Sequence, residues 1–125
     1  MAAPEKAAAI LRGIGVEPEE DLLTLAAEGA EEELKALLHT PDVPDGLMQT
    51  ASRLTAGKYL QAAAGSGRLQ TETLDLSAPF VTSLRMGDTQ QTFDAGDSAR
   101  ERLDGLIGSL LTLDDRLIFS YRRLP

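Results

Sequence analysis

Apolar and small side chains along residues 44–64 recur at the spacing of one helical face. These positions are Leu47, Met48, Ala51, Leu54, Tyr59, Ala62 and Ala63. Charged residues in this stretch are few, namely Asp45, Arg53 and Lys58, so most of its circumference is small or neutral. A helix of this kind favours a central place, with other helices packed closely on it. We therefore expect the chain to be organised around a helix over residues 44–64.

Two helices are predicted ahead of the central one. Residues 4–12 carry an apolar stripe and end before a glycine, which predicts a short helix. An acidic cluster at residues 17–21 opens a second helix, with Pro18 at its first position, that runs to Leu38. Its expected core face consists of Leu22, Leu25, Ala26, Gly29, Ala30, Leu34, Leu37 and Leu38. The short proline-bounded link at residues 40–44 predicts that this helix and the central one are antiparallel neighbours.

The helical spacing is lost over residues 68–96, after a Gly-Ser-Gly break. Alternation from Phe80 to Met86, followed by a Gly-Asp turn signal, predicts an extended or β-hairpin-like arm. An isolated hairpin is marginally stable in water. We therefore expect this arm to need support from the core or from another chain.

A capping-box pattern at residues 98–101 starts the last helical unit, and a dense stripe of leucine and isoleucine follows it. The pattern Thr112-x-x-Asp115 indicates a second N-terminal cap, so the helix is expected to break and restart there. Gly105 and Gly108 would each lower helix stability by about 1 kcal/mol in an exposed interior, which suggests the close approach of another backbone. Residues 1–125 are thus expected to form one mainly α-helical domain. It is a small bundle of about four to five helices, with the arm between the central and C-terminal helices.

Composition and charge exclude several classes of function. The chain has no cysteine, which removes disulfides, cysteine-based zinc sites and cysteine nucleophiles. Its net charge of −8 argues against sequence-specific DNA binding, because that binding depends on lysine and arginine at the phosphates. No apolar run approaches the roughly 18 residues of a membrane span. We expect neither a membrane segment nor a signal peptide.

Candidate catalytic or metal-binding residues are few. His39 is the single histidine, and its place at the end of an acidic helix favours a structural role. Asp75, Asp88 and Asp94 lie in the irregular segment, where two carboxylates would permit acid–base chemistry if they shared a concave pocket. A hydrolase using them is one alternative. Because no nucleophile or cofactor motif accompanies them, we expect that the protein is not an enzyme and binds no cofactor or metal.

Three features occur in an order that resembles a known family. The first is the acidic helix over residues 17–38 leading through a proline-bounded link into residues 47–60. The second is the glycine-broken segment with Thr-Ser-Leu-Arg-Met-Gly-Asp-Thr at residues 82–89, followed by Phe93. The third is the final helix running into Tyr-Arg-Arg-Leu at residues 121–124. Together they resemble the small head–tail connector (adaptor) proteins of long-tailed bacteriophages and prophages.

This resemblance implies a mostly helical, non-enzymatic structural protein of the virion, made in the bacterial cytoplasm. It would form a dodecameric ring under the portal protein, join the head to a tail-side connector or stopper protein, and let DNA pass without sequence-specific binding. The expected interface residues are Leu84, Met86, Asp88 and Phe93 in the arm, and Tyr121, Arg122, Arg123 and Leu124 at the C-terminus. The alternative outside this class is a small acidic helical regulator or adaptor that binds another cytoplasmic protein.

Overall fold

The computed structural model describes residues 3–66, 99–113 and 115–121. The described residues are mainly helical and include no β-strand. The helices are α1 (Ala3–Gly13), α2 (Glu20–Leu38), the 3-10 helix η1 (Asp45–Leu47), α3 (Met48–Gly65), α5 (Ala99–Leu111) and α6 (Asp115–Tyr121). The predicted arm over residues 68–96 lies outside the described residues. Within them, no helix combines the length and the apolar character needed to cross a lipid bilayer.

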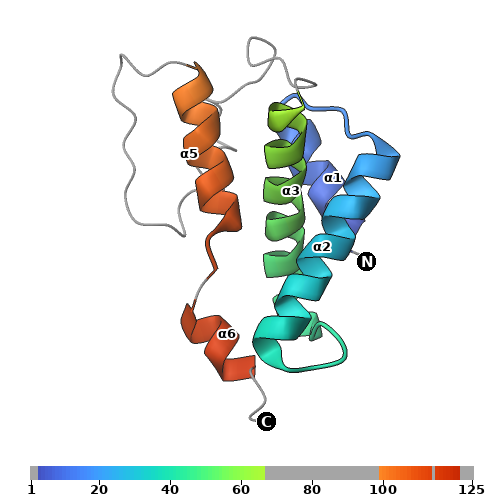
Figure 1. Cartoon of the computed structure of the whole chain (residues 1–125), viewed down its shortest axis with the longest axis vertical. Helices are drawn as coiled ribbons and strands as arrows, with labels where there is room; N and C mark the ends of the chain where they lie inside the picture. The colour runs from blue at the N-terminus through green and yellow to red at the C-terminus, as the bar shows by residue number, and fades with distance from the viewer. Residues whose placement is uncertain (1–2, 67–98, 114, 122–125) are drawn as a thin grey trace.

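Helix α3 is the centre of the bundle, as its weakly charged sequence predicted. Figure 1 shows it between α5 on one side and α1 and α2 on the other, and it packs on all three. Its small residues permit this contact, because Ala51, Thr55, Ala56 and Gly57 are all buried. The buried Thr55 hydroxyl donates a hydrogen bond to the Ala51 carbonyl at 2.7 Å, so it is not left unpaired in the core.

Two apolar clusters share α3. One contains the C-terminal half of α3 with α1, the first turns of α2, and α5, including Leu11, Leu60 and Leu106. The other joins the N-terminal half of α3 to the second half of α2, to η1 and to α6. Leu111 packs against both clusters. The bundle therefore has one end built around α1 and α5, and another built around η1 and α6.

The buried face of α2 differs from the predicted one. Leu23 and Ala27 are buried with Ala26, Ala30, Leu34 and Leu38. The expected core residues Leu25 and Leu37 are exposed by 64% and 41%. The reason is the run of neighbouring leucines at positions 22, 23 and 25 and at 37 and 38, which allows two faces of similar hydrophobicity. Contact with both α1 and α3 selects the face on which Leu23 and Leu38 lie.

The start of α2 also corrects the prediction, whereas its end at Leu38 is confirmed. The helix begins at Glu20 and its N-cap is Glu19, so Pro18 precedes the helix and does not occupy its first position. At the other end, His39 adopts the left-handed conformation with φ 54° and ψ 42°. The Thr40 N–H then donates to the Lys35 carbonyl at 3.3 Å, which closes the C-terminal turn of the helix.

The start of the central helix is interrupted. The sequence predicted one helix from Pro44, but Pro44 is extended, residues 45–47 form a 3-10 turn, and the α-helix begins at Met48. The Leu47 N–H donates to the Pro44 carbonyl at 2.9 Å and closes this turn. The turn places Leu47 in the core, fully buried, under the end of the bundle that carries α6.

The break between α5 and α6 is confirmed, but Thr112 does not cap α6. Its hydroxyl and its N–H both donate to the Gly108 carbonyl, at 2.7 and 3.1 Å, so Thr112 closes the end of α5, which it directly follows. The expected close approach at Gly108 is also wrong, because a Cβ there would meet nothing within 4 Å. The close approach occurs across the interface at Gly57 of α3. A Cβ at that position would lie 3.0 Å from Leu110 Cβ and 2.9 Å from Leu111 Cδ2.

Candidate protein-binding surface at the α6 end

Helix α6 is a short element held at one end of the bundle by a few apolar contacts. Ile118 is 8% exposed and belongs to the cluster of Leu34, Leu38, Leu47 and Leu54. The helix has only seven residues, of which Leu117, Ile118, Phe119 and Tyr121 are apolar or aromatic. Because successive residues of a helix point about 100° apart, these four cannot all face the core. Some of them must present apolar surface to the outside.

Tyr121 packs on the link before α3. Its ring lies over Gly46, where a Cβ would overlap the Tyr121 hydroxyl and lie 2.7 Å from the ring carbon Cζ. Any side chain at position 46 would displace this ring. The contact leaves Tyr121 37% exposed. Tyr121 therefore fixes the end of α6 to its own chain and still offers part of its ring to a partner.

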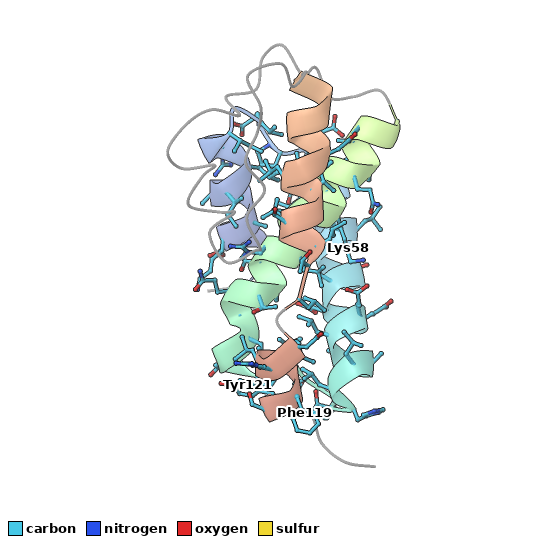
Figure 2. All side chains as sticks on the ribbon, turned by 90° about the vertical axis from the view of Figure 1, so that its left-hand side faces the viewer. Lys58, Phe119 and Tyr121 are labelled. Atoms are coloured by element: carbon cyan, nitrogen blue, oxygen red, sulfur yellow. The ribbon has the colours of Figure 1, made fainter. Side chains whose placement is uncertain are left out.

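Phe119 is the most exposed large apolar residue described, with 72% of its surface accessible. Figure 2 shows it at the same end of the molecule as Tyr121. Together with Leu37 it lines an open pocket of about 380 Å³ between the last turn of α2 and α6. The remaining lining residues are Ala36, His39, Asp115 and Ile118. We call this the α2–α6 pocket.

A second depression lies on the other side of α6. It has a volume of about 440 Å³ and is lined by Thr40, Pro41, Asp42, Pro44, Ser120 and Tyr121. The Thr40 hydroxyl donates to the Asp42 carbonyl at 2.7 Å, which holds the loop that forms its wall. Helix α6 thus stands between two depressions, with Phe119 beside the first and Tyr121 beside the second. The two depressions offer apolar contact area to a partner, with Asp115 lining the first and Asp42 lining the second.

The long acidic face of α2 runs towards this surface. Glu28, Glu32 and Glu33 are exposed, and Glu33 forms an ion pair with Lys58 of α3 at 3.5 Å. Lys58 reaches it across Gly29, where a Cβ would lie 3.7 Å from the lysine Cδ. The lysine is labelled in Figure 2 on the middle of the bundle. This pair is partly exposed and contributes little to stability. Glu32 is exposed as well and precedes Ala36 by four residues, one turn of the helix.

The predicted interface residues fall into two groups. Tyr121 is described and lies on the surface just defined. Arg122, Arg123 and Leu124, which follow it, lie outside the described residues, as do the arm residues Leu84, Met86, Asp88 and Phe93, so their roles remain predictions. The same holds for Asp75 and Asp94 of the enzyme alternative. Among the residues that the structure does describe, no three histidine, aspartate or glutamate side chains are grouped closely enough to hold a metal ion.

Sequence reasoning missed Phe119 and Leu37 as surface residues. It assigned Leu37 to the core face of α2 and Phe119 to a final apolar turn. A signal was present for Phe119, since three adjacent apolar residues in a seven-residue helix cannot be buried together on one face. No comparable signal distinguishes Leu37 from Leu38, because both extend the same leucine-rich pattern.

Comparison of the chain with protein-family models, with curated proteins and with solved structures found no match.

Proposed function

We propose that this protein is a structural component of a bacteriophage or prophage virion, a head–tail connector that forms a ring under the portal. Its partners are the portal protein, a tail-side connector or stopper protein, and further copies of itself. The proposal rests on the sequence resemblance, and in the structure it is supported by the apolar surface that α6 leaves exposed, where Tyr121 and Phe119 are 37% and 72% exposed. That helix leads directly into the residues Arg122, Arg123 and Leu124.

In this proposal the bundle of α1, α2, α3 and α5 is the rigid body. Helix α6 and the residues after it meet the portal, with Tyr121 and Leu124 burying apolar surface and the two arginines providing charge complementarity. The arm over residues 68–96 reaches a neighbouring subunit or the tail side. A closed ring of identical subunits requires head-to-tail contacts between two different surfaces of the chain.

The acidic charge of the chain supports a position beside DNA without tight binding to it. The chain carries 20 acidic and 12 basic residues. Duplex DNA binds tightly to proteins that neutralise its phosphates with lysine and arginine. A channel wall with more acidic than basic residues repels DNA, so the DNA can pass without being bound tightly.

The experiment is reconstitution with the portal ring encoded in the same phage or prophage genome. The purified chain is mixed with the purified portal ring, and binding is followed by sedimentation and by electron microscopy. We expect the intact chain to add a ring of density beneath the portal. Deletion of Ser120–Pro125 is expected to abolish this binding.

Because that deletion also removes the Tyr121–Gly46 contact, a milder variant is needed. Replacing Arg122 and Arg123 with glutamate leaves Tyr121 in place and is expected to abolish docking while the helical circular dichroism stays unchanged. Arg12→Glu, in the exposed last turn of α1, is the matched control and is expected to bind normally. Docking by the deletion variant would refute the role of the C-terminus. No binding by the intact chain would refute the connector function and favour the acidic regulator.

A further inference from the structure

We infer that the α2–α6 pocket receives an apolar side chain from a cationic segment of a partner protein. This inference concerns a described surface and does not depend on the virion role. It would hold equally for a regulatory protein.

Two exposed apolar side chains line the pocket. Phe119 and Leu37 have 72% and 41% of their surfaces exposed, on two different elements that line one pocket. Its inner side is Ile118, which is 8% exposed and packed in the core, so this wall is anchored. Aromatic residues such as Phe119 are enriched at the centres of protein interfaces, where they pack with the partner's apolar side chains. A volume of about 380 Å³ is suited to a large apolar side chain.

The backbone around the pocket is well defined by local interactions. His39 lines it from the left-handed turn that ends α2, and the following N–H is bonded to the Lys35 carbonyl. The pocket therefore lies between a closed helix end and α6. A partner would find this wall already formed and would not need to order a flexible loop on binding.

The sign of the partner's charge follows from the charges on this chain. Asp115 is exposed and lies on the rim of the pocket. Glu32 is exposed and stands one helical turn before Ala36. The second half of α2 and α6 together carry the acidic residues Glu31, Glu32, Glu33 and Asp115 against the basic residues Lys35 and Arg116, so acidic charge predominates around the pocket. A second copy docking through this same surface would bring its own Asp115 and Glu32 against these carboxylates, which opposes that contact at low salt. Lysine or arginine beside the inserted apolar side chain would instead be attracted.

The test is a titration of the full chain, labelled with ¹⁵N, with a synthetic helix-forming peptide of leucine and lysine. We expect amide shifts centred on Leu37, His39, Ile118 and Phe119, and weaker binding as salt is added. Phe119→Ala or Leu37→Ala is expected to raise the dissociation constant by about tenfold, a loss of affinity typical of truncating a moderately important interface residue. Both side chains are exposed, so neither variant should alter the fold.

Leu25→Ala is the matched control. Leu25 is also an exposed leucine of α2, but it lies twelve residues before Leu37, or roughly 18 Å along the helix. It should bind the peptide within about twofold of the unaltered chain. Asp115→Asn should weaken binding at low salt by about threefold, because it removes a charge from the rim.

Several outcomes would overturn the inference. One is equal binding of a control peptide in which glutamate replaces every lysine. Another is a set of amide shifts spread along α2 that Phe119→Ala and Leu37→Ala leave unchanged. A third is broadening of the amide signals of the pocket residues that grows with protein concentration in the absence of peptide, which would identify a second copy as the occupant. Absence of binding to the lysine peptide at low salt would also refute it.

Discussion

The backbone N–H of Glu19 donates a hydrogen bond to the phenolic oxygen of Tyr59 at 2.9 Å, across 40 residues of sequence. Tyr59 lies in α3 and is 3% exposed, whereas Glu19 is the N-cap of α2. The Glu19 side chain makes no capping bond to its own helix. The tyrosine therefore fixes the point at which the chain enters α2 to the centre of the bundle.

Tyr59→Phe is expected to lower the free energy of unfolding by about 1 kcal/mol, the usual net contribution of one hydrogen bond. The ring stays in the core, so packing is preserved and only the acceptor is lost. Urea denaturation measures the change. Thr24→Ala is the control, because the exposed Thr24 hydroxyl bonds only to the Glu20 carbonyl of its own helix, and its loss should change stability by less than about 0.5 kcal/mol. Equal losses in the two variants would contradict the role assigned to Tyr59.

Two helix glycines should respond oppositely to alanine. At Gly57 the added methyl group meets Leu110 and Leu111 at 3.0 and 2.9 Å, so Gly57→Ala should destabilise the fold by about 1–3 kcal/mol despite its better helix propensity. At Gly108 the methyl group enters open space, and Gly108→Ala should stabilise the protein by about 0.5–1 kcal/mol. Chemical denaturation of both variants checks the sign. Stabilisation by Gly57→Ala would mean that α3 and α5 are less closely packed than described.

The left-handed residue at the end of α2 gives a third prediction. His39 has φ 54°, a conformation that costs a residue with a Cβ about 1 kcal/mol and that glycine adopts freely. His39→Gly is therefore expected to raise the free energy of unfolding by about 0.5–1 kcal/mol, since part of the gain is offset by the flexibility of glycine in the unfolded chain. His39→Ala keeps the Cβ and should show no such gain. Thermal denaturation compares the two, and equal stabilities would contradict this account.

The central position of α3 was predictable from the sequence because residues 44–64 carry so few charges. The rotation of α2 was not, since adjacent leucines supply two equally apolar faces and only contact with α1 and α3 selects Leu23 over Leu25. The 3-10 turn at residues 45–47 was hidden for a similar reason, because the apolar spacing continues through it. At the surface, Tyr121 was predicted to contact a partner protein, and that stays a prediction; its packing on Gly46 was not foreseen, because it joins segments far apart in sequence. Phe119 was missed although the signal was there, since Leu117, Ile118 and Phe119 cannot all lie on one face of so short a helix.

The sharing of α3 between the two apolar clusters has a consequence for how the molecule opens. Neither end retains a complete core if the other is lost, because both depend on the same helix and on Leu111. The amides of α1 and those of the second half of α2 should therefore exchange with solvent through one common opening of the bundle, rather than through two separate ones. Occupation of the surface beside Phe119 would then slow hydrogen exchange in α1, at the opposite end, without any contact there.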